Sequence, residues 1–238
     1  GLSPADLAMH VVLPEVDGRI FAGVASFKSA GKRDPDLQYS RFAHRADPAR
    51  IAAMADRVAG WHRLAATPAT ERKTALILST YPGKDWQLAH AVGLDALASA
   101  EGVLTALAEA GHKVAPGAGL GTALATATLD WPVADYLSAI ETLPLSLREA
   151  LAAAWGDPAS DPSVTDGHFR FHAIRRGSGL VALQPERGEV KARADDYHDL
   201  SRTPRHAYVA FYLWLRSEAL HALIHIGAHG TLEWLPGK

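Results

Sequence analysis

The chain has 238 residues, of which 48% are hydrophobic and 21% are charged, so it can bury a substantial core as one large domain or two small ones. Its formal net charge of -2 gives no general attraction to nucleic acid or to an anionic membrane, and no apolar run approaches the roughly 20 residues that a membrane span needs. The absence of cysteine excludes disulfides, thiolate metal ligands and cysteine nucleophiles.

The start of the chain contains two short apolar runs, residues 7–13 and 20–27, which predict buried strands. The polar residues 29–47 include glycine and proline and indicate a surface loop. Apolar residues then recur every three or four positions, which predicts a helix over residues 48–66 with Asp47 as its N-cap. This helix is expected to supply packing rather than chemistry.

The next part of the chain has the pattern of a βαβ unit. Residues 73–79 predict a strand, residues 94–110 predict a helix closed by Gly111, and residues 112–115 predict a second strand. We therefore expect a right-handed parallel crossover.

Two glycine motifs near this unit do not match phosphate-binding loops. Pro82-Gly83-Lys84 lacks the spaced glycine and the following Ser or Thr of a Walker A loop. Gly117, Gly119 and Gly121 miss the dinucleotide pattern, because Thr122 stands where its third glycine belongs. We expect no ATP site in this chain.

The second half of the chain predicts a hairpin and three helices. Residues 156–167 are rich in proline, aspartate and glycine and indicate a loop or a boundary between lobes. Residues 168–174 alternate between polar and apolar and, with residues 179–183 after a glycine turn, predict a β-hairpin. The helices are expected over residues 133–141, 145–154 and 207–218.

The last stretch of the chain carries the strongest chemical signal. It places four candidate donor residues at intervals of four, namely His221, His225, His229 and Glu233. Gly227 and Gly230 interrupt any helix. The apolar, β-branched run of Ala222, Leu223, Ile224 and Ile226 predicts a buried strand followed by a turn. Ligand sites of open α/β sheets lie at the carboxyl ends of strands. We therefore interpret His225, His229 and Glu233 as a metal or acid-base site suited to Co²⁺, Zn²⁺ or Fe²⁺.

These elements define an α/β protein with a Rossmann-like βαβ lobe. We expect one α/β lobe, which carries the site, to combine residues 1–66 with 168–238, and a Rossmann-like or helical lobe to cover residues 67–167. Because the chain opens on Gly1 and ends directly after its densest motif, we expect an internal piece of a larger multidomain subunit. The absence of a signal sequence predicts a cytoplasmic location.

Several motifs, from the first residues to the last, resemble one family. They are MHVVLPEVDG at 9–18, LQPERG at 183–188, DYHD at 196–199, PRHAYVAFYLWLR at 204–216 and HIGAHGTLEWLPGK at 225–238. These motifs are similar to those of the large subunits of ATP-dependent tetrapyrrole metal chelatases, the family of cobaltochelatase and magnesium chelatase. VGLDALASA at 92–100 and AWGDP at 154–158 resemble the cobalt branch more closely.

The resemblance implies a parent subunit that holds a tetrapyrrole, hydrogenobyrinic acid a,c-diamide, and inserts Co²⁺ into it during aerobic cobalamin synthesis. It also implies two partners, an AAA+ ATPase subunit and its companion subunit, which bind ATP with Mg²⁺ and hydrolyse it, so that no ATP binds here. The piece alone is expected to be inactive. No nucleic acid and no membrane are expected among the partners.

Metal insertion requires the removal of the hydration shell of the ion and of two ring N–H protons. We expect Glu233 to be the proton acceptor or metal-guiding carboxylate, assisted by His229, with His225 and His229 as transient ligands. The resemblance points to the same carboxylate. Further candidates for substrate contact are His10, Glu15, Gln184, Arg187, His198 and His206. An arginine suits the acidic side chains of a corrinoid precursor because its guanidinium binds carboxylates in a bidentate way.

Other interpretations remain open. The chain could belong to the magnesium branch, which acts on protoporphyrin IX. His225, His229 and Glu233 could instead be three ligands of a hydrolytic zinc site with an open fourth position. They could also brace their loop by hydrogen bonds alone, or the chain could be a docking segment for the AAA+ partners.

Overall fold

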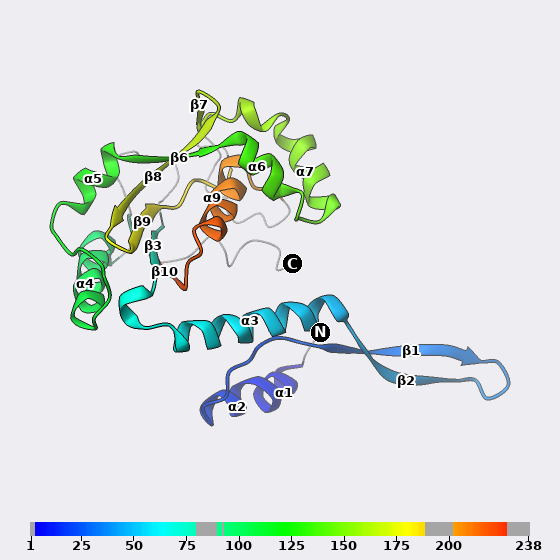
Figure 1. The fold of residues 1–238 in the computed structure, drawn as a ribbon. Helices are drawn as coiled ribbons and strands as arrows, with labels where there is room; N and C mark the ends of the chain where they lie inside the picture. The colour runs from blue at the N-terminus through cyan, green and yellow to red at the C-terminus, as the bar shows by residue number, and fades with distance from the viewer. Residues whose placement is uncertain (1–2, 80–89, 92, 189–201, 228–238) are drawn as a thin grey trace. The chain divides into compact units, whose positions relative to one another are not determined.

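A computed structural model describes residues 3–79, 90–91, 93–188 and 202–227 of the chain (Figure 1). The chain divides into two compact units, residues 1–66 and 67–238. The first unit contains a helical segment, a hairpin and a long helix, and the second contains a six-stranded sheet covered by helices. The mixed α/β class that the sequence predicts is therefore confirmed.

The first unit begins with a helical segment, α1 (Pro4–Leu7), which continues as the π-helical turn η1 (Ala8–Val12) and α2 (Leu13–Val16). The strand predicted over residues 7–13 is wrong. A capping box starts the helix, because Ser3 Oγ accepts a hydrogen bond from the Asp6 backbone N–H at 3.1 Å and an Asp6 carboxylate oxygen accepts one from the Ser3 N–H at 3.0 Å. Periodicity alone does not separate a short apolar strand from a short apolar helix, and here the cap favours the helix.

An antiparallel hairpin follows, in which β1 (Ser26–Asp34) pairs with β2 (Tyr39–Ala46). Two predictions are wrong here. The strand expected over residues 20–27 begins only at Ser26, and the loop expected over residues 29–47 forms most of the hairpin. A two-stranded ribbon exposed on both faces lacks the apolar alternation by which a strand is predicted.

The helix α3 (Pro48–Ala66) closes the first unit and confirms the predicted helix. Its first turn is capped by Asp47, whose Oδ1 accepts a hydrogen bond from the Arg50 N–H at 3.1 Å. No residue of α3 is buried, and Ile51, Val58 and Trp61 are exposed.

The second unit is built on a sheet with the strand order β10-β3-β9-β8-β6, and β7 pairs with β8 beside this path. β3 is parallel to both of its neighbours, whereas β8 is antiparallel to β9 and to β6. The strands are β3 (Thr74–Leu78), β6 (Thr128–Pro132), β7 (Val164–Thr165), β8 (His168–Arg176), β9 (Gly179–Leu183) and β10 (Ala222–Ile226). Two further strands, β4 (His90–Ala91) and β5 (Leu94–Asp95), form a separate antiparallel pair.

Three of the predicted strands are confirmed as β3, β9 and β10, and the predicted hairpin is the β8–β9 pair. The strand expected over residues 112–115 is wrong, because among the described residues this segment forms a single bridge, between Val114 and Gly177, and no strand. Both edges of β3 are occupied by β9 and β10, so the parallel partners of β3 come from far along the chain and not from the next element.

Helices cover both faces of the sheet. The predicted helices are confirmed within one or two residues at each end. They are α4 (Ala96–Glu109), α6 (Val133–Ile140), α7 (Leu145–Trp155) and α9 (His206–Ser217). A helix that was not predicted, α5 (Leu120–Thr126), and the 3-10 turns η2 (Ala69–Glu71) and η3 (Pro158–Ser160) complete the unit.

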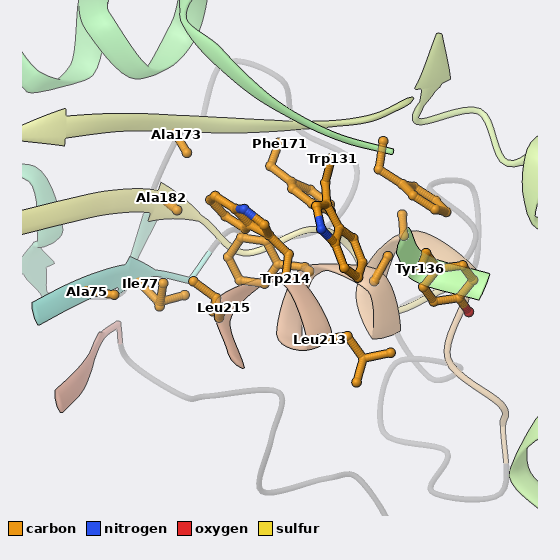
Figure 2. Packing of buried hydrophobic residues seen from close by; sticks show 14 of the residues in the cluster. Ala75, Ile77, Trp131, Tyr136, Phe171, Ala173, Ala182, Leu213, Trp214 and Leu215 are labelled. Atoms are coloured by element: carbon orange, nitrogen blue, oxygen red, sulfur yellow. The ribbon is translucent and has the colours of Figure 1, made fainter. Parts of the chain in front are cut away.

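The core has two parts, one on each face of the sheet. On one face, aromatic residues of β6, β8, α6 and α9 pack together, and Figure 2 shows Trp131, Phe171 and Trp214 among them. On the other face, α4 and α5 cover Leu76 and Leu78 of β3 and the facing residues of β9 and β10. Helix α9 therefore defines one side of the sheet and α4 the other.

The sheet also corrects the expected division of the chain. Residues 168–238 were expected to group with residues 1–66, and residues 67–167 to form a separate lobe. Instead β3, from residues 67–167, lies between β9 and β10, and residues 67–238 form one unit. Backbone hydrogen bonds between the strands join these two parts of the chain. Among the helices in the described ranges, none combines the length and the hydropathy that a membrane crossing requires.

Candidate functional site

The carboxyl ends of three parallel strands meet at one edge of the sheet. The pairing continues one residue past the strands, because the Ser79 N–H donates to the Ile226 carbonyl at 3.0 Å and the Gln184 N–H donates to the Leu78 carbonyl at 2.9 Å. Gly227, Ser79 and Gln184 therefore follow β10, β3 and β9 in one row across the edge. In α/β sheets this is the edge at which ligands bind.

The polar residues of this edge lie on the α9 side of the sheet. Side chains alternate between faces along a strand, and the paired residues His225, Ile77 and Ala182 share one face. Ile77 and Ala182 belong to the α9 side of the core, as Figure 2 shows. Ser79 and Gln184, each two residues further on, lie on the same side.

His225 is the member of this group with free coordinating atoms. Its ring stacks on Tyr212 of α9, with centroids 6.2 Å apart and planes inclined by 22°. Both ring nitrogens are buried and, within the described part of the chain, neither has a hydrogen-bond partner. Burial lowers the pKa of His225, because the charged form loses hydration. A neutral imidazole with a free lone pair is the form that binds a metal ion.

Gln184 follows β9, which β3 separates from the strand of His225, and is only 2% exposed. Its Nε2 donates to the Tyr208 hydroxyl at 3.3 Å and also to the Tyr212 hydroxyl. Burial raises the pKa of Tyr212, so its hydroxyl stays protonated. Tyr212 thus links the two candidate residues, since its ring contacts His225 and its hydroxyl contacts Gln184.

Arg187 follows β9 and is also buried, with 4% of its surface exposed. Its backbone carbonyl accepts a hydrogen bond from the Arg205 N–H at 2.8 Å, which joins the segment after β9 to the start of α9. The candidate substrate residues Gln184 and Arg187 therefore belong to the same side of the fold.

His206 is the first residue of α9, and both of its ring nitrogens form hydrogen bonds inside the protein. Its Nδ1 is 2.7 Å from the Tyr136 hydroxyl and its Nε2 is 3.1 Å from the Gly156 carbonyl. Because a carbonyl only accepts, Nε2 carries the proton and Nδ1 accepts from Tyr136. His206 thus connects α6, the end of α7 and α9, whereas His225 has no such partner in the described residues.

Next to His206, an ion pair anchors the start of α9. Arg205 Nη2 lies 2.6 Å from Asp161 Oδ1, and Asp161 Oδ2 accepts a hydrogen bond from the Ala207 N–H at 3.2 Å. Burial alone would raise the pKa of Asp161, but the Arg205 guanidinium and the N–H groups of Ser163 and Ala207 lower it, and the lowering prevails. This carboxylate stays charged and holds the helix in position.

Several predicted residues lie elsewhere. His221 directly precedes β10, and its Nδ1 accepts a hydrogen bond from the Lys73 N–H at 3.0 Å at the amino end of β3. Four residues along a strand span about 13 Å, so His221 is far from the carboxyl edge. His10 and Glu15 are on η1 and α2 of the first unit, where His10 is exposed.

Three predicted residues, His198, His229 and Glu233, lie outside the described residues. Within the described ranges, no group of three or more histidines and carboxylates is arranged to hold a metal ion. Of the expected set of His225, His229 and Glu233, the structure thus describes one member, and the roles assigned to all three stay predictions.

Sequence reasoning missed two kinds of residue at this edge. Ser79 ends a predicted strand, so the rule that sites lie at carboxyl ends could have selected it. Tyr208 and Tyr212 lie within the motif PRHAYVAFYLWLR, but nothing in their spacing indicates that they lie beside His225 and Gln184.

Comparison with known proteins matches the whole chain to one family. The model of the CobN/Magnesium Chelatase family covers residues 1–238. The chain is 39% identical to the aerobic cobaltochelatase subunit CobN of Pseudomonas aeruginosa, over all of this chain and 20% of that protein. It is 29% identical to a magnesium-chelatase subunit of Rhodobacter capsulatus, over all of this chain and 22% of that protein.

A solved structure agrees with this match. The catalytic subunit of cobaltochelatase from Mycobacterium tuberculosis superimposes with a TM-score of 0.72 at 33% sequence identity. The alignment covers 100% of this chain and 21% of that subunit. The chain spans about a fifth of the length of the curated relatives that it matches.

Proposed function

This chain belongs to the CobN/magnesium chelatase family, and on that basis we propose that it is part of the large subunit of a cobaltochelatase. In this proposal the subunit binds hydrogenobyrinic acid a,c-diamide and is the place where Co²⁺ enters the ring, in aerobic cobalamin synthesis. The relatives are metal chelatases, which favours metal insertion over hydrolysis by a zinc site. The piece alone is proposed to be inactive, since it spans about a fifth of its relatives.

The cobalt branch is favoured by the similarity of the relatives. The identity is 39% and 35% to two cobaltochelatase subunits, and 29% to the magnesium-chelatase subunit of Rhodobacter capsulatus. The magnesium branch, with protoporphyrin IX and Mg²⁺ as substrates, is the alternative. The two branches require the same chemistry of the protein, since in both a hydrated divalent ion replaces two ring protons.

One structural observation supports the location of this chemistry. His225 offers an uncharged imidazole, unpartnered within the described ranges, at the edge where β10, β3 and β9 end. Imidazole nitrogen is a ligand that Co²⁺ accepts readily, and each such bond can be exchanged for a ring nitrogen as the ion enters the tetrapyrrole. We assign His225 the role of a transient ligand.

The proposal also gives roles to two residues after Gly227, His229 and Glu233. His229 and Glu233 follow β10 within seven residues of its end. We assign His229 to the ion as a second ligand, and Glu233 to the ion and to the two protons that leave the ring. These two assignments rest on the sequence and on the resemblance of the motif.

Contacts to the tetrapyrrole are assigned to the residues of the same edge. Gln184 presents an amide and Arg187 a guanidinium after β9, and the acidic side chains of the ring suit an arginine. His198 remains in the proposal from its motif alone. His10, Glu15 and His206 stay predictions, and for His206 the contacts with Tyr136 and Gly156 favour a structural role.

The energy for insertion is proposed to come from partner subunits. An AAA+ ATPase subunit and its companion would bind ATP with Mg²⁺ and act on this subunit. The sequence supports this division, because its glycine motifs do not match phosphate-binding loops. The cytoplasmic location stays a prediction.

The test is Glu233→Gln in the full-length subunit assayed with its partners. Co²⁺ insertion is expected to be lost, while tetrapyrrole binding, followed by absorbance, stays within about twofold of wild type, because the amide keeps the shape but cannot accept the proton. Glu149→Gln on the surface of α7 is the matched control and should leave both unchanged. Normal insertion by Glu233→Gln would refute the proposed role of this carboxylate.

A further inference from the structure

Ser79 is a buried polar residue whose hydroxyl has no partner among the described residues. The residue is 6% exposed, and in the described part of the structure its Oγ forms no hydrogen bond. A buried hydroxyl without a partner is unfavourable for folding, so a residue of this kind in a packed sheet indicates another requirement. Neither the sequence motifs nor the proposed function assign it a role.

The end of the neighbouring strand, β10, passes very close to the Ser79 side chain. A Cβ atom at Gly227 would lie 2.6 Å from both Cβ and Oγ of Ser79, which is too close for any side chain. Glycine at this position therefore lets the end of β10 approach Ser79 directly. The close approach also holds the serine side chain at the edge, on the same face as His225.

The strand register places Ser79 and His225 on the same face of neighbouring strands, two positions apart. Strands lie about 4.8 Å apart and rise about 3.3 Å per residue, so the Cα atoms of two residues on neighbouring strands, offset by two positions, are separated by about 8 Å. An ion lies about 2 Å from an imidazole nitrogen and about 2 Å from its own water, and a hydrogen bond adds about 3 Å. These contacts add up to about 7 Å between the imidazole nitrogen and the hydroxyl oxygen, and two side chains that leave one face of the sheet from Cα atoms about 8 Å apart can span it.

We propose that Ser79 is part of the site at which the divalent ion is received, where its Oγ accepts a hydrogen bond from a water molecule of the ion that His225 binds. The proposal rests on the proposed function. It adds a hydrogen-bonding residue from the end of β3 to the ligand from β10, so the ion is held between two strands while it loses its water. The hydrated ion would then be the missing partner of both the Ser79 hydroxyl and the His225 ring nitrogens.

The experiment compares two serines in the full-length subunit. Ser79→Ala removes the orphan hydroxyl at the carboxyl edge, and Ser178→Ala removes another buried hydroxyl without a partner in the described ranges, just before β9 at the opposite edge of the sheet. Co²⁺ alone is titrated by calorimetry, and the Tm is measured without metal. We expect Ser79→Ala to raise the Kd for Co²⁺ roughly threefold to tenfold, with an unchanged or higher Tm. Ser178→Ala should leave the Kd unchanged.

Two results would overturn the inference. An unchanged Kd in Ser79→Ala would show that the hydroxyl does not contact the hydrated ion. A clearly lower Tm would show that it has a resident partner, such as a buried water, in the absence of metal. His225→Phe separates the two proposals. If His225→Phe also binds Co²⁺ as wild type does, the proposed role of His225 as a ligand fails. If His225→Phe binds Co²⁺ more weakly and Ser79→Ala does not, only the proposed role of Ser79 fails.

Discussion

Tyr212 and His225 stack with their ring centroids 6.2 Å apart and their planes inclined by 22°, which places an aromatic ring of α9 against the imidazole of β10. The hydroxyl of the same tyrosine accepts a hydrogen bond from Gln184, which follows β9. One side chain of the helix therefore sets the orientation of two candidate site residues on two different strands.

The two functions of Tyr212 can be separated by substitution. Tyr212→Phe keeps the ring and removes the hydroxyl, and is expected to lower the free energy of unfolding by about 1 kcal/mol while Co²⁺ binding changes less than about twofold. Tyr212→Leu removes the stacking surface. It is expected to reduce the free energy of Co²⁺ binding by at least as much as it reduces the free energy of unfolding. Calorimetric titration and urea unfolding measure the two effects. Equal Co²⁺ affinities for the two variants would show that the stacking does not position His225.

The close approach of Gly227 to Ser79 predicts a destabilising substitution with a specific rescue. Gly227→Ala is expected to lower the free energy of unfolding by about 1–3 kcal/mol, because the new methyl group overlaps the serine side chain. Ser79→Gly removes the atoms in the way, so the double variant should regain part of that loss. Urea unfolding of the two single variants and the double variant gives the coupling free energy. Additive effects would contradict the clash.

The ion pair between Asp161 and Arg205 predicts a large loss of stability on substitution. Asp161→Asn is expected to lower the free energy of unfolding by about 3–5 kcal/mol, because it leaves the Arg205 charge in a site where its side chain is only 11% exposed. Asp130→Asn is the matched control at an exposed pair with Arg170 and should cost about 1 kcal/mol or less. A similar loss in both variants would exclude a special role for the buried pair.

The same carboxylate predicts how stability depends on pH. The pKa of Asp161 is lower in the folded protein than its ordinary value, so the unfolded chain takes up the proton first as the pH falls. The contribution of Asp161 is complete above the pKa of the unfolded chain, near 3.8. It is lost as the pH falls below that value through the lowered pKa of the folded state. Wild type should therefore lose more stability than Asp161→Asn between about pH 4 and pH 2, as followed by thermal unfolding.

The contacts of His206 predict a structural effect in place of a functional one. His206→Phe fills a similar volume and leaves the Tyr136 hydroxyl and the Gly156 carbonyl without these hydrogen bonds, at a cost of about 1–3 kcal/mol for each group. The Kd for Co²⁺ and tetrapyrrole binding should change little in the folded fraction. Weaker tetrapyrrole binding at unchanged stability would restore His206 as a substrate contact.

Much of the local structure could be predicted from the sequence. The helix α3 was predicted from its N-cap and its regular apolar spacing. Strand β10 was predicted from its β-branched run, which ends at a glycine. Such signals are contained in a few neighbouring residues. They failed for residues 7–13, where a cap outweighed the apolar run, and for residues 29–47, where the strands are exposed on both faces.

The candidate site was only partly accessible in this way. His225 and Gln184 were selected from the sequence, at the ends of a predicted strand and a predicted hairpin, and the structure places both at one edge. Ser79 and Tyr212 were not selected, because their significance depends on which strands and helix lie beside them.

The sequence by itself therefore determined the α/β class, most of the helices, the last strand and the donor-rich segment that follows it. Only the tertiary structure decided that β3 lies between β9 and β10, so that residues 79, 184 and 225 share one edge and one face. It also separated the two histidines near α9, since among the described residues His206 is held by two internal hydrogen bonds and His225 by none. Helix caps and apolar spacing act over a few residues, whereas the pairing of parallel strands joins segments about a hundred residues apart or more, and no local pattern specifies which of them meet.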